Sequence, residues 1–404
     1  MPPILGAMTA STPRNLLTNP ATDLHGAGKT FALRRGLSLM PTRDGAYRIV
    51  RGGESVLIAT AFARSAVLAL ASGKNPFLGV PSSDRKLVED LIDSLARVGF
   101  ITSGRSEIAL PPRYLNEVIE RDLAAQQLRT RCEPELLQCQ WSDAADKFNE
   151  DQGAEILAAR AEKQVLISGR NRIATLLHSL LLSSGVSQVE CVDRYDQALI
   201  RDSDIGSSTI TGDNLAQNFY EHLQSHRRAL SLFPLQRRQS QQRDKGGAQD
   251  KRRTLVIHSG AIDLEDMLDW LTSQQPHLVI HPAVADEITI GPLVIPGMTP
   301  CQRCADLNQM ERLGYSSTNR IPLTENSEVA MVGAHFIASL VASQVLHFLD
   351  SALVNDGTHN TFAASAASPT SAIARTTRVN LQNLVSLQIN SITQHPLCGC
   401  GNFS

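Results

Sequence analysis

Four cysteines in the last part of the chain stand in two close pairs, and they constrain the fold more than any other feature. Cys301 and Cys304 are separated by two residues, and Cys398 and Cys400 by one. Each spacing can place two thiolates on one side of a turn, at about the separation of two ligands of a tetrahedral zinc ion. The pairs together predict a closed four-sulfur zinc site, which is typically structural because no position remains for water. Such a site ties the end of the chain to a loop far earlier in the sequence.

Two other interpretations of these cysteines stay open, namely four unrelated thiols and two redox pairs. Pro300 precedes the first pair, and Gly399 and Gly401 flank the last cysteine. Proline and glycine form tight turns, which bring closely spaced ligands to one side. These neighbours therefore favour the zinc site.

Composition narrows the class of protein. The 404 residues carry a net charge of −2 and 4% aromatic side chains, which argues against a polyanion binder and against stacking on single-stranded nucleic acid. The length indicates two or three domains. No secretory signal is visible at the start, so we expect a cytoplasmic protein in which clustered cysteines bind metal. Cys132, Cys139 and Cys191 show no partner spacing and are expected to be ordinary thiols.

The first part of the chain predicts a flexible leader, residues 1–30, and a small α+β module, residues 31–114. The module opens with short alternating runs such as AYRIV and SVLIA, separated by RDG and RGG. These runs predict a strand meander with tight turns. Two helices are expected next: the first ends at Gly73, and the second begins at Ser82 or Ser83.

The residues of the second helix indicate whether the module binds DNA. Its apolar stripe consists of Leu87, Leu91, Ile92 and Leu95. Strands followed by two short helices predict a winged-helix-like module. DNA binding is disfavoured, because Glu89, Asp90 and Asp93 lie on the same helix and a phosphate-facing helix avoids acidic residues.

The remainder of the chain predicts a helical connector, residues 115–163, and an α/β domain, residues 164–404. The domain begins with an apolar strand that ends in Gly169, continues with an amphipathic helix closed by Gly185, and returns to a strand that ends in Asp193. Strand, glycine turn, helix and strand with a closing acid are typical of a Rossmann-type fold.

Two later segments of the domain have unusual composition. Residues 235–253 are basic and rich in Gln without an apolar period, which predicts a mobile loop. Residues 328–349 are strongly apolar, but Glu328 and His335 interrupt them and no basic flank follows. A buried helix, across the sheet or at a dimer contact, is therefore favoured over a membrane span.

Taken together, these pieces resemble the ThiF-like (ubiquitin-activating-type) superfamily. More narrowly, the chain is similar to actinobacterial ThiF-like proteins of azole-peptide (bacteriocin) biosynthesis. The segment GPLVIPGMTPCQRCADL, residues 291–307, and the closing HPLCGCG carry the resemblance. A weaker match, residues 30–102, is to the family's peptide-recognition winged helix. The resemblance implies a structural zinc on the four cysteines, a bound precursor (leader) peptide, a homodimer and a YcaO-type cyclodehydratase partner.

Active relatives bind ATP and magnesium through a GxGxxG loop. The matching segment here keeps Gly169 and has Ala174, an accepted substitute for the third glycine. Asn171 replaces the second glycine, and its side chain would crowd a phosphate. Arg170 and Arg172 offer phosphate contacts of their own. The resemblance therefore implies a weakened nucleotide site.

Other nucleotide-site positions also depart from the active pattern. Asp193 matches the ribose-binding acid, although a cap on the following turn explains it equally well. The stretch RDSDIGSSTI lacks the arginine that active relatives carry after this turn. Segment 259–261 stands in place of a magnesium-binding aspartate, with Asp263 close but shifted. His258 and His281 end strands at the same edge, where a lone histidine is more often structural.

The leading hypothesis is a degenerate ThiF-like protein that binds a precursor peptide and presents it to a YcaO-type cyclodehydratase. The peptide is expected to add a strand to residues 44–59 and to pack on helix 84–98. The alternative is an active ATP-dependent adenylyltransferase that activates a carboxylate of a small protein or peptide. An NAD-dependent oxidoreductase shares the Rossmann opening but leaves the cysteine pairs unexplained.

Overall fold

The computed structural model of the chain forms two compact units, Met1–Ser106 with Asn149–Gln152 and Glu107–Phe148 with Gly153–Ser404. It describes residues 32–34, 36–51, 53–58, 60–102, 131, 133–139, 154–192, 198–232, 254–314, 328–351 and 372–400. The predicted leader 1–30, the predicted loop 235–253 and Asp193 lie outside the described residues.

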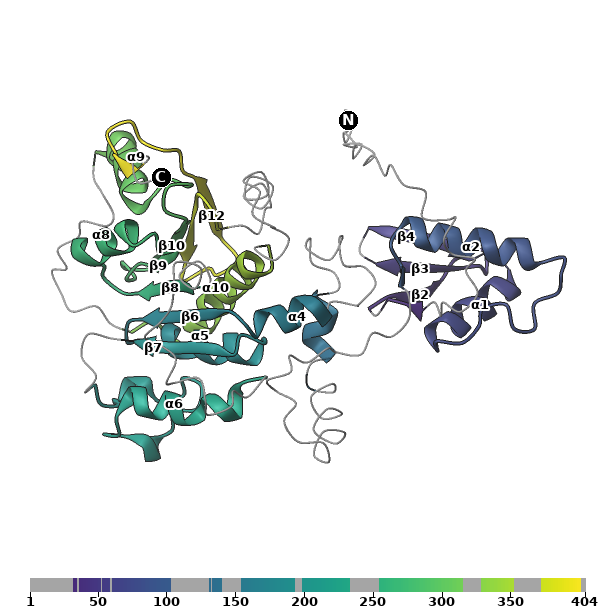
Figure 1. The fold of residues 1–404 in the computed structure, drawn as a ribbon, viewed down its shortest axis with the longest axis horizontal. Helices are drawn as coiled ribbons and strands as arrows, with labels where there is room; N and C mark the ends of the chain where they lie inside the picture. The colour runs from purple at the N-terminus through teal and green to yellow at the C-terminus, as the bar shows by residue number, and fades with distance from the viewer. Residues whose placement is uncertain are drawn as a thin grey trace, which may run out of the picture. The chain divides into compact units, whose positions relative to one another are not determined.

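The first unit contains a three-stranded antiparallel sheet and two helices (Figure 1). The strands β2 (Ser38–Pro41), β3 (Tyr47–Arg51) and β4 (Glu54–Ile58) form the predicted meander, with β3 in the middle. A separate pair joins β1 (Ala32–Leu33) to β5 (Ile101–Thr102). Strands β2 and β4 are therefore the two edges of the small sheet.

The first helix of this unit ends just before the glycine that the sequence predicts as its end. Helix α1 (Ala61–Ala71) is capped by Thr60, whose side chain accepts a hydrogen bond from the Ala63 N–H at 3.1 Å. Gly73 follows it with φ of +64°, a left-handed conformation that favours glycine.

The second helix, α2 (Arg85–Arg97), differs from the prediction at its start. Its N-cap is Asp84 rather than Ser82 or Ser83. The buried stripe consists of Val88, Leu91, Ile92 and Leu95. Leu87, expected in that stripe, is 47% exposed. A start one to two residues later leaves Leu87 on the first turn, outside the face that packs on the unit.

The second unit is built on a seven-stranded mixed sheet in the order β12-β11-β10-β9-β8-β6-β7 (Figure 1). The strands are β6 (Gln164–Ser168), β7 (Gln188–Val192), β8 (Thr254–Ser259), β9 (His277–Ile280), β10 (Glu287–Val294), β11 (Arg375–Asn380) and β12 (Leu387–Ser391). Strands β7, β6, β8 and β9 run parallel, whereas β10, β11 and β12 are each antiparallel to their neighbours. The predicted α/β class is confirmed.

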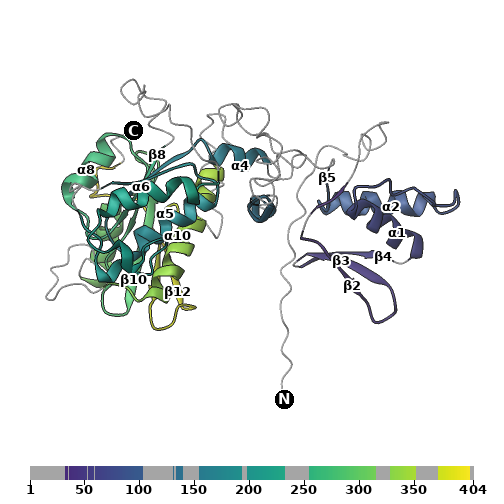
Figure 2. The same ribbon diagram turned by 90° about the horizontal axis from the view of Figure 1, so that it is seen from below.

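Helices cover this sheet in two groups. The bounds are α5 (Arg172–Ser183), α6 (Phe219–Leu230), α8 (Leu264–Thr272), α9 (Gln302–Leu313) and α10 (Met331–Ser351). The large apolar core lies between the sheet and helices α5 and α10, which run side by side (Figure 2). A smaller cluster joins Met267 and Leu271 of α8 to Val294 and the four cysteines.

Helix α10 is the apolar stretch that the sequence marks. By length and composition Met331–Asp350 could cross a membrane, but most of this helix is buried inside the fold. Ile337, Val341 and Val345 are fully buried in the core that α10 shares with α5. Because α5 of the same chain covers α10, the apolar composition of this helix gives no separate reason to expect a dimer.

The end of the predicted connector packs into the second unit. Helix α4 (Ala154–Arg160) ends in a side chain that is almost fully buried, and Arg160 donates to both carboxylate oxygens of Asp350 at 2.8 and 2.7 Å. Arg160 also donates to the Ser184 carbonyl at 3.2 Å, at the end of α5. A paired and hydrogen-bonded buried arginine fixes α4 to α10 and α5.

Candidate metal centre and nucleotide loop

The four predicted cysteines come together. Their sulfur atoms all lie within 4.8 Å of one another and all four residues are buried. The Cys301–Cys398 and Cys304–Cys400 distances are 3.4 Å, and Cys301–Cys304 is 4.0 Å. A tetrahedral zinc ion with bonds of about 2.3 Å needs sulfurs about 3.8 Å apart. The cluster therefore has the size that zinc requires, and its distances are far longer than a disulfide bond of about 2.0 Å.

The first cysteine pair begins a helix rather than lying on a loop. Cys301 is the N-cap of α9 and Cys304 lies in its first turn. The positive end of a helix stabilises negative charge, so it favours the thiolate form that binds metal. The spacing of Cys301 and Cys304 predicts a turn. It does not predict helix α9, because the amphipathic pattern of this helix is weak.

Hydrogen bonds within the cluster differentiate the four thiols. The hydrogen bond from the Cys301 thiol lowers the pKa of Cys304 to about 4, and the same contact raises the pKa of Cys301. The backbone N–H of His395 also donates to the Cys304 sulfur at 3.4 Å. Burial raises the pKa of Cys398 to about 11. One thiolate thus forms readily, and full deprotonation requires the charge of a bound cation.

Polar contacts join the two halves of the cluster. Asn308 of α9 donates to the Cys304 carbonyl and to the Thr393 carbonyl, both at 2.8 Å. Gln394 donates to the Cys400 sulfur at 3.8 Å. These contacts orient the ligands from both segments, as is usual around metal sites. With all four positions supplied by the chain, the arrangement fits structural zinc.

The segment that the resemblance matches to the GxGxxG nucleotide loop lies between β6 and α5, where the sequence predicts a glycine turn. Gly169 adopts φ of +113°, and a Cβ at this position would lie 2.1 Å from the Ser259 carbonyl oxygen. The neighbouring strand β8 therefore approaches too closely for any side chain. Gly169 is required by packing, independently of any nucleotide.

Asn171 occupies the start of α5 with its own side chain. Its Oδ1 accepts a hydrogen bond from the Ala174 N–H at 2.9 Å. Its Nδ2 donates to the carbonyl oxygen and the hydroxyl of Ser259, both at 3.0 Å. The second glycine of a GxGxxG loop leaves this space open for phosphate. Here an amide fills it and satisfies an N–H that a phosphate would otherwise bind.

Both arginines of the loop are committed to protein acceptors. Arg170 pairs with the buried Asp204 carboxylate at 2.8 Å, also donates to the Leu199 carbonyl, and lies over the Phe219 ring. Arg172 donates to the Ser203 carbonyl at 2.6 Å and to the Val329 carbonyl at 3.1 Å. These contacts hold the guanidinium groups in place, so a phosphate would have to compete with them.

A carboxylate of the chain lies at the N-terminus of α5. The Glu328 side chain accepts a hydrogen bond from the Arg172 N–H at 3.4 Å. Burial raises the pKa of Glu328, and the nearby Asp204 carboxylate raises it further. A helix N-terminus favours an anion, and here the protein supplies one itself. In the sequence, Glu328 stands out only as a single acidic residue that interrupts an apolar stretch.

The strand end that holds magnesium in active relatives carries no acid here. Ser259 is hydrogen-bonded to Asn171, and Asp263 is the N-cap of α8, beyond the end of β8. His258 contacts the Ala261 carbonyl at 2.7 Å, so it braces this turn. His281 follows β9 at the same edge of the sheet, as predicted, and it lines a polar pocket beside α9.

Solved structures share this fold. Escherichia coli MccB with AMPCPP and MccA gives a TM-score of 0.56 at 13% identity, covering 92% of this chain and 99% of that one. The microcin C7 biosynthetic enzyme MccB with N-formylated MccA gives 0.55 at 13% identity, with the same coverage. PaaA gives 0.56 at 13% identity, covering 89% and 99%. No protein-family model and no curated protein matches the chain. The comparisons therefore show a fold that this chain shares with MccB and PaaA.

Proposed function

We propose that this chain is a degenerate ThiF-like protein of modified-peptide biosynthesis that binds a precursor peptide without activating a carboxylate itself. One observation carries the proposal: the chain fills the N-terminus of α5 with Asn171 and Glu328. The cysteine cluster meanwhile keeps the geometry of a metal site. A protein that retains its structural clasp while occupying its own phosphate site is better suited to presenting a substrate than to adenylating it.

The peptide is proposed to bind the winged-helix-like first unit by adding a strand to β4. As an edge strand, β4 has N–H and C=O groups that can pair with an incoming chain. Helix α2 packs beside β4. Val56 and Ile58 point into the core, whereas Leu57 is 47% exposed on the opposite face. An added strand would place its side chains next to Leu57. MccB, solved with MccA, is a precedent for a peptide ligand on this fold.

The proposed partner is a YcaO-type cyclodehydratase that forms azolines on the bound peptide in the cytoplasm, with this chain acting as a homodimer. The direct test reconstitutes the partner and the peptide with and without this chain. Azoline formation, measured by mass spectrometry as loss of water, is expected only when the chain is present. Equal conversion without it would reject the presenting role.

Purified, zinc-loaded protein is expected to bind no ATP. Calorimetry with ATP and magnesium should show no saturable heat up to about 1 mM, the upper end of common enzyme KM values. The reason is that Asn171 and Glu328 already satisfy the N–H groups that hold phosphate. ATP–pyrophosphate exchange should stay at background. Saturable ATP binding with exchange would instead support the alternative, an adenylyltransferase.

Peptide binding is expected to depend on Leu57. Short peptides encoded beside the gene can be labelled and titrated by fluorescence polarisation. The Leu57→Asp variant should weaken binding by about fivefold or more, because a cross-strand apolar contact contributes up to about 1 kcal/mol and a charge there adds desolvation. Leu78→Asp is the matched control, since Leu78 is 79% exposed between α1 and α2. No binding at about 50 μM protein, or equal loss in both variants, would contradict this surface.

A further inference from the structure

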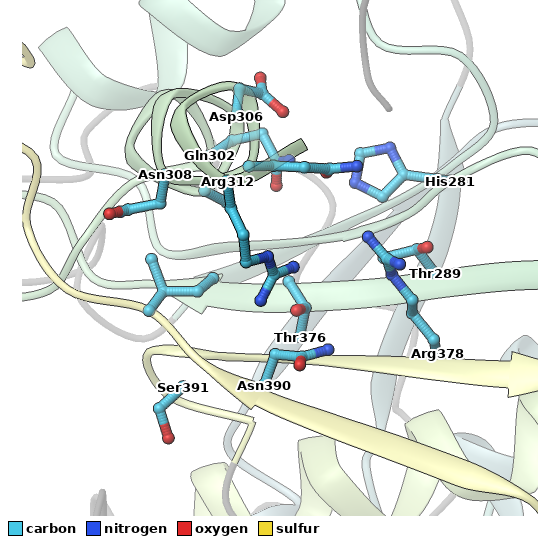
Figure 3. Close-up of a pocket in the computed structure, with 13 residues that line it drawn as sticks. His281, Thr289, Gln302, Asp306, Asn308, Arg312, Thr376, Arg378, Asn390 and Ser391 are labelled. Carbon is cyan, nitrogen blue, oxygen red and sulfur yellow. The ribbon is translucent and has the colours of Figure 1, made fainter. Parts of the chain in front are cut away.

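A polar pocket lies between α9 and one face of strands β10, β11 and β12 (Figure 3). We call it the α9 pocket. Its polar lining includes His281, Thr289, Arg312, Thr376, Arg378 and Asn390. Figure 3 shows the guanidinium groups of Arg312, from the helix, and Arg378, from the sheet, pointing into the same space. No step of the proposed function uses this pocket.

Strand alternation explains why this face is polar. In β10 and β11, Ile288 pairs with Val379 and Thr289 with Arg378, and paired residues share a face of the sheet. Ile288 and Val379 belong to the core under α10. The alternate residues therefore face α9. This face is half-buried beside α9, and its threonine, asparagine and arginine side chains give the pocket a polar lining.

Two features of the pocket favour a ligand of particular chemistry. Within the described residues, neither Arg312 nor Arg378 makes an ion pair or a side-chain hydrogen bond. Gln302, which also lines the pocket, is only 3% exposed. Its Oε1 atom has no hydrogen-bond partner in the described part of the chain. Two guanidinium groups favour an oxyanion, and a buried amide oxygen without a partner favours an N–H donor.

The charge of the pocket distinguishes between oxyanions. Arg312 and Arg378 contribute two positive charges, and Asp306 contributes one negative charge to the lining. The net balance suits a singly charged carboxylate better than a doubly charged phosphate. We propose that the α9 pocket binds a carboxylate carried next to an N–H, as in an N-acylated amino acid or the C-terminus of a peptide.

The test uses small probes on the full-length, zinc-loaded protein. N-acetylglycine carries both the carboxylate and the N–H, acetate lacks the N–H, N-acetylglycinamide lacks the carboxylate, and inorganic phosphate is the competing anion. Saturation-transfer NMR should show saturable binding of N-acetylglycine below about 50 mM, the range that ligand efficiency allows for so small a molecule. Acetate should bind several-fold more weakly, and the amide should show no saturable binding.

Variants connect this binding to the pocket. Arg378→Gln and Arg312→Gln should each weaken N-acetylglycine binding about tenfold or more, the effect of losing a charge-assisted hydrogen bond. Arg375→Gln is the matched control, because strand alternation places it on the opposite face of β11. Arg312 is exposed on α9, so its variant decides the matter if Arg378→Gln does not fold.

Four outcomes would overturn the proposal: no saturable binding of N-acetylglycine, equal binding of the amide, tighter binding of phosphate, or affinity unchanged in both arginine variants. The proposal stands apart from the nucleotide loop and the first unit. Its failure would therefore leave the proposed function untouched, and failure of ATP or peptide experiments would leave the pocket untouched.

Discussion

Replacing Cys301 or Cys398 with serine is expected to release zinc and to lower the melting temperature of the second unit by about 10 °C or more. The two residues come from segments far apart in the sequence and their sulfurs lie 3.4 Å apart. Loss of one thiolate opens the site and removes the cross-link. Structural zinc contributes many kcal/mol to small domains, and even about 3 kcal/mol shifts the melting temperature of a unit this size by several degrees.

The measurement is zinc content by atomic absorption together with a thermal melt. Cys191→Ser is the matched control, because Cys191 is also buried but packs in the core of β7 and α5, away from the cluster. It should keep one zinc per chain and lose only modest stability. A Cys301→Ser protein with full zinc content and an unchanged melting temperature would reject the four-thiolate clasp.

Local patterns made the opening of the second unit predictable. Short apolar runs identified β6 and β7, and glycines marked the ends of β6 and α5. The spacing within the cysteine pairs predicted that the two pairs form one cluster, because C-x-x-C and C-x-C spacings restrict ligand geometry before any fold is known. The mixed sheet order follows less directly, since strand pairing depends on contacts between distant segments.

The occupied nucleotide loop could not be predicted, because its contacts are non-local. Asn171 and the two arginines are local to the loop, yet their partners Ser259, Asp204 and Glu328 come from three other segments. Sequence spacing suggested that Arg170 and Arg172 were available to phosphate, but the structure gives both of them protein acceptors. Asp193 lies outside the described residues, so its role in binding ribose stays a prediction.

The start of α9 illustrates a different limit. Helix α9 has an apolar face too weak to mark from sequence, because its inward side chains are the cysteines of the cluster and polar residues that line the α9 pocket. Periodicity identifies helices that pack on an apolar core. It does not identify a helix whose inner face carries cysteines and polar side chains.

Gly169→Ala is expected to destabilise the second unit by about 3 kcal/mol or more, whether or not ATP is present. Two costs add. A residue with a side chain is strained at φ of +113° by about 1–3 kcal/mol. Its Cβ would also lie 2.1 Å from the Ser259 carbonyl oxygen, an overlap that forces β6 and β8 apart at a similar cost.

Thermal melts with and without ATP measure this loss of stability. Gly212→Ala is the control, because nothing lies within 4 Å of its Cβ, and its melting temperature should not change. The surviving glycine of the loop is then explained by strand packing alone. If Gly169→Ala melts like the parent protein, strand packing does not require the glycine. If ATP restores the stability of the variant, ATP binds and the proposal of an occupied site is wrong.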